Sequence, residues 1–365
     1  MKLRWDPCVV QNSSEFDSFL ADFIDVPDRN CLLVGGAGFD PRTNLVPRKF
    51  STLKRAKLTA VLFREERLRD QPLLRPLADN NQTAIQSLLP SAAFPRIEIF
   101  ADGVTAVGGR NVAEYFRGLD YTPLTDIFVD ISALSCGLFF PLVAMFIAAS
   151  DQRQGRPLNV HLLVAEEPDF DNRIRGIPGD TAATLHGFKG ERSFDLSTEE
   201  AVLWLPTLAF GAEATLQRIY NFIYRSTIPI DVCPVIPFPG HDPRMPDRLV
   251  EEYQERLDGW RTDFRNIFYA AESDPLDAYR AISELCQLRR ELFAELGGSR
   301  TILSPMGNKM LSVGAMLAAI EFQLTVVMVE SVGYDEESDI GFLCSPIALK
   351  HVWLCGDAYP TISYN

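Results

Sequence analysis

A glycine-rich turn follows the first strongly apolar run of the sequence. It reads Gly35-Gly-Ala-Gly-Phe-Asp-Pro-Arg42, and glycines at such a junction permit positive φ angles and close approach of a ligand to the backbone. The candidate ligand-binding residues here are Gly36, Gly38, Asp40 and Arg42. Neither the full Gly-x-Gly-x-x-Gly pattern nor a phosphate-binding Lys-Ser/Thr pair is present, so a purely structural turn is the alternative.

A second candidate segment is Asp130-Ile-Ser-Ala-Leu-Ser-Cys-Gly137, in which a buried strand delivers two hydroxyl groups to the start of a helix. Unpaired N–H groups and the helix dipole favour an anion or a carbonyl oxygen at that position. Ser132 and Ser135 are therefore candidate ligand contacts, and simple N-capping is the alternative. The Gly-x-Ser-x-Gly elbow of serine hydrolases is absent.

The segment Ser304-Pro-Met-Gly-Asn-Lys309 has the same character and adds a lysine inside the helix-entry loop. Ser304, Asn308 and Lys309 could meet a phosphate or an acidic group of a partner, although Lys309 could equally be a solvated surface residue. His241 beside Asp242 could act as a general base, but no nucleophile accompanies it in the sequence. We assign no catalytic residue.

The cysteines and histidines do not predict a metal site. Seven cysteines are scattered and mostly lie in apolar runs, which is typical of buried free thiols. The four histidines are far apart in the sequence, and no pair of cysteines has the spacing of zinc ligands.

Composition limits the partners of the chain. The net charge of −14 argues against duplex nucleic acid, whereas a small anionic ligand needs only local donors, and a basic partner protein would suit the acidic surface. The first residues lack the apolar core of a signal peptide, and the most apolar stretch, 138–150, is too short to span a bilayer. We expect a cytoplasmic protein that does not enter a membrane, and an oligomer is compatible with the sequence.

Apolar runs alternate with helical segments along the chain, and they predict the strands and helices that position the candidate residues. In the first half, the expected strands are 31–35, 58–63, 96–100, 127–131 and 160–164, with helices at 111–117 and 138–150. In the second half, the expected strands are 202–208, 230–237, 266–270, 301–303 and 324–329, with helices at 216–224, 246–257, 275–296 and 311–322. Strands that are apolar throughout and separated by helices indicate a parallel sheet covered on both faces.

The chain is therefore predicted to be an α/β protein of two Rossmann-like parallel-sheet halves. At 365 residues it exceeds the size of one hydrophobic core, and we expect a first lobe at 1–170, a connection at 171–200 and a second lobe at 201–365. The halves align at offsets of about 166 to 174 residues, which favours internal duplication over chance periodicity. Ligands of such sheets bind at the carboxyl ends of the strands.

The segment Gly36-Ala-Gly-Phe-Asp-Pro-Arg42 resembles the first motif of S-adenosylmethionine-dependent methyltransferases of the leucine carboxyl type, which reads approximately Gly-Ala-Gly-x-Asp-Thr-Arg. The resemblance implies that the glycine turn would contact the methionine part of the cofactor and that Glu65 or Glu66 would hold the ribose. Pro41 replaces the threonine of the family, and a second α/β half replaces its substrate lid.

The arrangement of two halves with matching helix-entry loops is similar to the CRISPR-associated Rossmann fold sensors and to their fused two-copy relatives, the SAVED domains. The resemblance implies recognition of a cyclic oligonucleotide in prokaryotic antiviral defence, with contacts from Ser132, Ser135, Ser304, Asn308 and Lys309. No nuclease or protease segment is fused to this chain, so an effector would be another chain.

Three functions follow as hypotheses. The first is a noncatalytic, ligand-sensing or partner-binding subunit with a nucleotide-type ligand, in a prokaryotic antiviral defence system. The second is a methyltransferase that uses S-adenosylmethionine. The third is a protein-binding scaffold without a small ligand.

Overall fold

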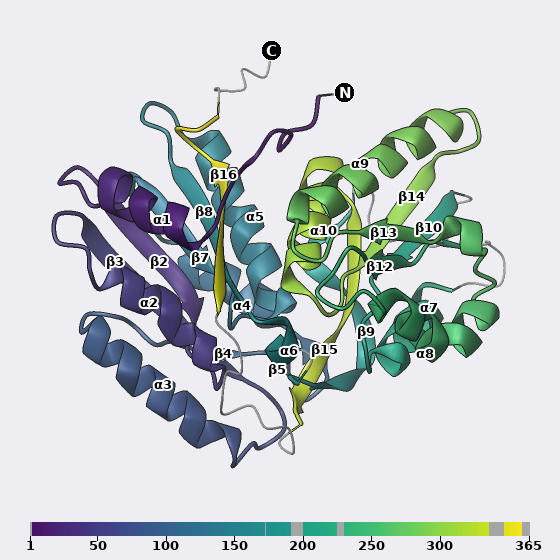
Figure 1. Ribbon diagram of the computed structural model, residues 1–365, viewed down its shortest axis with the longest axis horizontal. Coiled ribbons are helices and arrows are strands. Elements are labelled where there is room, and N and C mark those ends of the chain that lie inside the picture. The colour runs from purple at the N-terminus through teal and green to yellow at the C-terminus, as the bar shows by residue number, and fades with distance from the viewer. Residues whose placement is uncertain (1, 172, 191–199, 225–229, 336–346, 360–365) are drawn as a thin grey trace. The chain divides into compact units, whose positions relative to one another are not determined.

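The structure is a computed structural model that describes the chain except residues 1, 172, 191–199, 225–229, 336–346 and 360–365. The chain divides into two compact units (Figure 1). The first unit consists of Pro7–Ile174 and Gly333–Asn365, and the second unit consists of Met1–Asp6 and Arg175–Val332.

In the described residues, the first unit contains a seven-stranded sheet in the order β1-β16-β8-β7-β2-β3-β4. The strands are β1 (Val9–Gln11), β2 (Asn30–Gly36), β3 (Lys57–Glu66), β4 (Arg96–Glu98), β7 (Asp126–Asp130), β8 (Asn159–Glu166) and β16 (Ala348–Cys355). The five strands from β4 to β8 are parallel, and β16 is antiparallel to both β8 and β1. Numbered along the chain, the parallel strands have the order 3-2-1-4-5, which is the Rossmann order.

Helices cover both faces of this sheet. They are α1 (Ser13–Phe19), the π-helix η1 (Leu20–Ile24), the 3-10 helix η2 (Pro41–Asn44), α2 (Leu45–Phe50), α3 (Leu74–Leu88), α4 (Gly108–Phe116), α5 (Cys136–Gln152) and α6 (Pro168–Asp171), and a hairpin of β5 (Phe100–Ala101) and β6 (Thr105–Ala106) precedes α4. Figure 1 shows α1 and α2 on one side of the sheet and α5 on the other. No helix within the described ranges is both long and apolar enough to cross a membrane.

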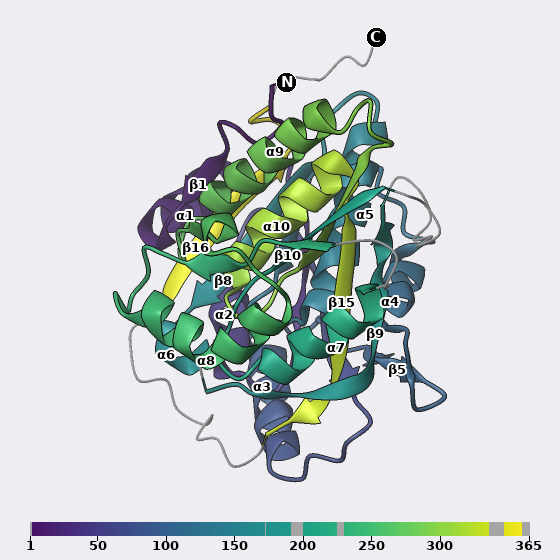
Figure 2. The same ribbon diagram turned by 90° about the vertical axis from the view of Figure 1, so that its right-hand side faces the viewer.

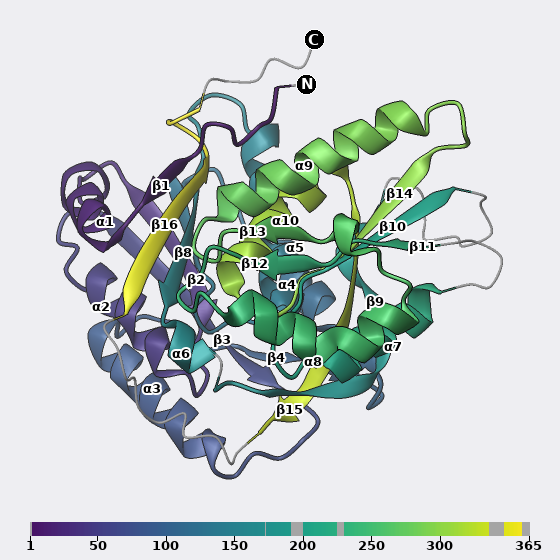
Figure 3. The same ribbon diagram turned by 45° about the vertical axis from the view of Figure 1, so that its right-hand side comes forward.

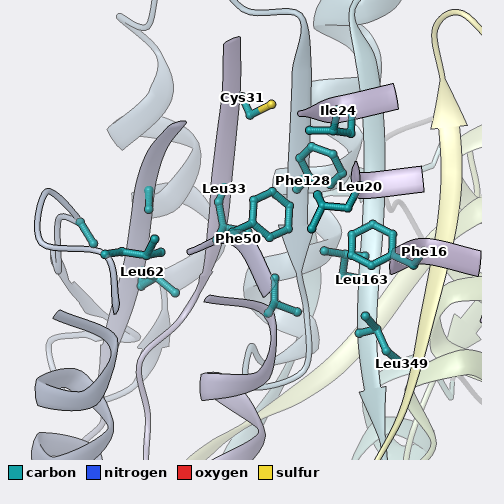
Figure 4. Close-up of a cluster of buried hydrophobic side chains, with 14 of the residues drawn as sticks. Phe16, Leu20, Ile24, Cys31, Leu33, Phe50, Leu62, Phe128, Leu163 and Leu349 are labelled. Carbon is teal, nitrogen blue, oxygen red and sulfur yellow. The ribbon is translucent and has the colours of Figure 1, made fainter. Parts of the chain in front are cut away.

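The core of the first unit explains its apolar sequence. Phe16 of α1 and Phe50 of α2 pack on Leu33, Phe128 and Leu163 of the sheet, as Figure 4 shows. All five residues of β7 are buried, because helices cover both of its faces. A strand in that position cannot alternate polar and apolar residues, which is why the runs are apolar throughout.

The second unit repeats the strand order. Its strands are β9 (Gly176–Lys189), β10 (Ala201–Pro206), β11 (Ile230–Val232), β12 (Val235–Pro237), β13 (Phe268–Ala270), β14 (Ser299–Ser304) and β15 (Thr325–Tyr334). They form the sheet β11-β10-β14-β15-β9 and the parallel pair β12-β13, and a parallel bridge from Thr207 to Val235 carries the order on from β10 to β12. From β13 to β15 the order is again 3-2-1-4-5.

The helices of the second unit are α7 (Glu213–Ile223), α8 (Met245–Gly259), the 3-10 helix η3 (Phe264–Asn266), α9 (Pro275–Leu292) and α10 (Lys309–Phe322). Helices α9 and α10 lie side by side in Figures 2 and 3. Gly314 of α10 makes this packing close, because a Cβ there would lie 2.3 Å from the carbonyl oxygen of Pro275. A second cluster of buried side chains in this unit contains two tryptophans. Trp204 of β10 packs against Trp260, at the end of α8, with a ring-centroid distance of 5.0 Å.

The predicted fold class is confirmed: both units are Rossmann-like α/β structures. Strands β2, β7 and β8 correspond to β10, β14 and β15 in sheet position, and these are the segments that the sequence offset aligns. The shared strand order supports internal duplication.

The predicted division of the chain differs from the observed one. The expected connection, 171–200, contains β9, which joins the sheet of the second unit, and the expected second lobe, 201–365, contains β16, which joins the sheet of the first. In each case the strand that follows the fifth parallel strand leaves its own half and pairs in the other sheet. Pairing partners, and not neighbours along the chain, decide which sheet a strand enters. Part of 171–200 lies outside the described residues.

A buried polar chain crosses the first unit. His161 Nδ1 lies 2.9 Å from His351 Nε2, His161 Nε2 lies 3.3 Å from Asp126 Oδ1, and His351 Nδ1 lies 2.7 Å from the side-chain amide of Gln11. Both imidazoles are fully buried. Burial lowers the pKa of His161, although Asp126 opposes this, and burial lowers the pKa of His351 well below its ordinary value. Burial therefore favours the neutral form of both histidines in the folded state.

These histidines predict that the fold loses stability as the pH falls below about 6.5. A histidine with a depressed pKa in the folded state binds its proton more readily in the unfolded state, so each lowers stability by up to about 1.4 kcal/mol per pH unit between its unfolded-state and folded-state pKa values. Thermal unfolding between pH 7.5 and 5.5 measures the effect. We expect His351→Gln to reduce the pH dependence by roughly half, and His186→Gln, at an exposed histidine, to leave it unchanged. If the pH dependence of the melting temperature were unchanged in His351→Gln, the depressed pKa of His351 would not be its cause.

Candidate functional site

Within each unit, the loop after the first parallel strand contacts the loop after the fourth parallel strand. In the first unit, a Cβ on Gly36 would lie 2.7 Å from the carbonyl oxygen of Ala133, and in the second unit a Cβ on Gly307 would lie 2.6 Å from the Cβ of Ala209. Rossmann-like sheets bind their ligands where these loops diverge. Glycine is required at both positions by the protein's own packing.

Gly38 lies two residues further on and has open space around its Cα, with nothing within 4 Å of the Cβ it could carry. Its carbonyl oxygen accepts a hydrogen bond from Asn81 Nδ2 at 2.9 Å. The glycine turn is therefore tied to α3 through its backbone, and its accessible part is centred on Gly38.

Asp40 and Arg42 form a buried ion pair. Asp40 caps η2 by accepting from the backbone N–H of Arg42, and the guanidinium of Arg42 binds both carboxylate oxygens of Asp40. Arg42 also donates to Asp171 at 2.6 Å and is only 1 % exposed. Burial opposes the charge of Arg42, but Asp40 and Asp171 raise its pKa above the ordinary value. The pair ties the glycine turn to the segment after β8.

The amino end of α5 is closed by a carboxylate of the chain. Glu65, from β3, accepts the backbone N–H of Ser135 at 3.0 Å and also binds Arg67. Ser135 occupies the N-cap position, but its hydroxyl makes no capping hydrogen bond and is buried without a partner among the described residues. Glu65 thus stands where an anionic ligand would meet the helix.

Ser132 lies two residues after the fourth strand of the first unit, Ser304 is the last residue of the fourth strand of the second unit, and both are fully buried. Ser132 Oγ accepts the backbone N–H of Ala165 at 2.8 Å and donates to Asp130. Ser304 Oγ accepts from Trp204 Nε1 at 3.0 Å and donates to the carbonyl oxygen of Val327 at 2.9 Å. Each serine fastens the end of its strand to the neighbouring fifth strand.

Asn308 and Lys309 begin α10. The side-chain oxygen of Asn308 accepts from the backbone N–H groups of Met310 at 2.7 Å and Leu311 at 3.1 Å, which makes Asn308 the N-cap. Lys309 is half-buried at the first position of the helix. The predicted segment therefore supplies a cation at a helix entry.

The carboxyl edge of the second sheet carries further residues that the sequence analysis did not assign. Phe210 follows β10 and is 36 % exposed, and the guanidinium of Arg248 lies 5.0 Å from its ring centroid. His241 follows β12, and its Nδ1 lies 2.7 Å from Glu272 Oε2, after β13. Gly240 permits this contact, since a Cβ there would lie 2.7 Å from that oxygen.

His241 was noticed in the sequence beside Asp242, but its carboxylate partner is Glu272, 31 residues away. No local pattern signals that pairing, because it depends on β13 lying next to β12. Phe210 carried a signal in the sequence: a large aromatic residue next to a glycine in the short loop after a buried strand. Among the described residues, no three His, Cys, Asp or Glu side chains gather as a metal site.

Comparison with known proteins does not assign a family. No family model and no curated protein matches the chain. A crystal structure of a universal stress protein from Pseudomonas aeruginosa UCBPP-PA14 is similar at 10 % identity and a TM-score of 0.26, covering 83 % of this chain and 94 % of that chain. Neither value is high enough to transfer a function.

The buried ion pair predicts a large loss of stability for Asp40→Ala. The substitution leaves Arg42 buried with only Asp171 as counter-charge, which we expect to cost about 3 to 5 kcal/mol in the free energy of unfolding. Urea denaturation followed by circular dichroism measures the loss.

A matched control exists in the second unit. Asp263 caps η3 and binds Arg265 through the same hydrogen bonds, which lower the pKa of Asp263 to about 2, but both side chains are exposed. We expect Asp263→Ala to cost far less than Asp40→Ala. Equal losses would show that burial does not determine the strength of this motif.

Proposed function

We propose that the chain is a noncatalytic, ligand-sensing subunit that binds a nucleotide-type ligand at the carboxyl edge of the sheet in its second unit. The observation that carries the proposal is the exposed ring of Phe210 beside Arg248 at this edge. An accessible aromatic ring next to a cation suits a stacked base with a nearby phosphate. In the cytoplasm, such a subunit would report ligand binding to an effector on another chain.

The contrast between the two carboxyl edges supports the choice of the second unit. In the first unit, the side chains of Arg42 and Arg67 are 1 % and 3 % exposed and are paired with carboxylates. In the second unit, the side chain of Arg248 binds Asp242 at 2.5 Å but is 53 % exposed, and that of His241, which contacts Glu272, is 31 % exposed. A solvent-accessible arginine such as Arg248 can exchange its carboxylate partner for a phosphate at lower cost than a buried one.

Strand order sets the span of the proposed surface. The loop of Phe210 lies between the loop of His241, one strand away on β12, and the loop of Lys309, one strand away on β14. Neighbouring strands are about 4.8 Å apart, so the outer loops are separated by about 10 Å. A dinucleotide or cyclic oligonucleotide covers that distance, whereas a single phosphate does not.

Several contacts support a noncatalytic role. The helix entries after both fourth strands have protein partners, because Glu65 accepts the backbone N–H of Ser135 before α5 and Asn308 caps α10. The methyltransferase alternative would place S-adenosylmethionine at Gly36–Arg42, where Asp40 and Arg42 bind each other. Participation in prokaryotic antiviral defence is the biological context that we propose from the resemblance to the sensor families.

The proposal predicts a ligand-dependent rise in the melting temperature. We would record native mass spectra of the protein purified from cells and then thermal shifts with dinucleotides, cyclic oligonucleotides and S-adenosylmethionine, because a ligand of the folded state stabilises it by mass action. We expect an oligonucleotide to bind, and Phe210→Ala to weaken its affinity about tenfold through loss of stacking. Lys309→Ala should weaken it as well.

The control is Arg265→Ala, at an exposed arginine before β13, which should leave the affinity unchanged. A shift with S-adenosylmethionine alone would support the methyltransferase instead. Absence of any bound mass and of any shift would favour the protein-binding scaffold.

A further inference from the structure

A cavity of about 210 Å³ opens at the amino edge of the sheet in the second unit. It is lined by the starts of β14 and β15, by Glu200 just before β10, and by the last turns of α9 and α10. The proposed nucleotide surface lies at the opposite edge of the same sheet. The cavity is therefore a separate feature, and its interpretation does not depend on the proposed function.

Three guanidinium groups line this cavity, from Arg289, Arg290 and Arg300, against one carboxylate, Glu200. The lining side chains thus carry two more positive than negative charges. This is unusual in a chain whose net charge is −14. A local excess of cations in a concave site attracts anions and raises their local concentration.

The three arginines differ in the hydrogen-bond partners that the chain provides for their guanidinium groups. Arg300 binds Glu200 at 3.1 Å, and Arg290 donates to the carbonyl oxygen of Phe322 at 3.2 Å, where it serves the carboxyl end of α10. Arg289 donates through Nε to Ser299 Oγ at 2.8 Å and through Nη1 to Asp231 at 3.0 Å. Its Nη2 is buried without an acceptor among the described residues.

A buried guanidinium nitrogen without an acceptor is costly, and in native proteins such groups are rare. The side chain of Arg289 is held in place by its other two hydrogen bonds and by Phe293, whose ring centroid lies 4.6 Å from the guanidinium carbon. These contacts hold the guanidinium at the wall of the cavity, where an oxyanion that entered could accept hydrogen bonds from it.

We propose that this cavity binds a small dianion of the phosphate type, with Arg289 as the principal donor and Arg300 and Arg290 as flanking cations. The volume holds a phosphate group with a few attached atoms, and is too small for an oligonucleotide. Asp231 offsets part of the charge of Arg289, and the positive charge that remains at the cavity favours an anion such as a phosphomonoester. Tetrahedral oxyanions also suit the planar fork of arginine better than monovalent halides do.

Isothermal titration calorimetry of the full chain with inorganic phosphate, glycerol phosphate and sodium chloride at equal ionic strength tests the proposal. We expect both phosphates to bind saturably, and chloride not to bind. Tighter binding of glycerol phosphate would identify a phosphomonoester as the ligand class, and equal binding would identify free phosphate. Binding that is the same for chloride would overturn the proposal.

Two variants with opposite expected effects make the test independent of folding defects. Arg289→Gln should weaken phosphate binding about tenfold or more, because it removes a charged hydrogen-bond donor. Glu200→Gln should strengthen binding severalfold, because it removes the carboxylate that repels the anion. Arg265→Gln, at an exposed arginine outside the cavity, should leave binding unchanged. Weaker binding in Glu200→Gln would mean that altered packing, and not charge, controls the cavity, and would contradict the proposal.

Discussion

The buried polar groups at the carboxyl edges of both sheets must find hydrogen-bond partners, and the chain supplies them itself. A strand that ends beneath a helix amino terminus leaves N–H and C=O groups that a protein can satisfy with side chains or with a ligand. In the first unit, Glu65 and Ser132 provide these partners, and in the second unit Asn308 and Ser304 do so. These contacts satisfy part of the backbone at each edge, whereas the buried hydroxyl of Ser135 has no partner among the described residues.

This constraint explains why two units with one strand order have different edges. In both units a buried serine fastens the end of the fourth strand, and the flanking loops make a close contact. Beyond this common framework, the first unit encloses its charges, as Arg42 with Asp40 shows, whereas the second unit leaves Arg248 and Phe210 accessible. A duplicated framework can keep its fold through shared internal contacts while only one copy retains an open surface.

The sequence predicted the parallel strands well because their burial on both faces requires continuous apolar runs, as in β7 and β8. It did not predict β9 or β16. In β9 every third residue is buried, from Gly179 to Phe188, and this is not the period of two that marks a half-buried strand. Both strands also pair far from their neighbours in the chain, and neither propensity nor periodicity reports a partner that comes from the other half.

The candidate site was predictable in position but not in the state of its side chains. The turns after the first and fourth strands were located correctly because glycine, serine and asparagine mark such junctions. Burial of Arg42 could not be read from its neighbours: Asp263 and Arg265 have the same spacing and the same cap geometry, yet they are exposed. The spacing of the aspartate and the arginine determines their hydrogen bonds, whereas burial by the surrounding fold determines how much those hydrogen bonds contribute to stability.

The strand β14 connects the two surfaces of the second unit for which we propose anionic ligands. Arg300, at the cavity, and Ser304, at the opposite edge, are four residues apart on this strand, which corresponds to about 13 Å. Substitutions at that separation, without shared partners, usually have additive effects on stability and binding. Coupling between the two surfaces would require a structural element with two alternative conformations, one of which is preferred by the ligands at both ends. The strand β14 does not suit that role, because regular parallel pairing holds it between β10 and β15. The two surfaces are therefore expected to bind their ligands independently.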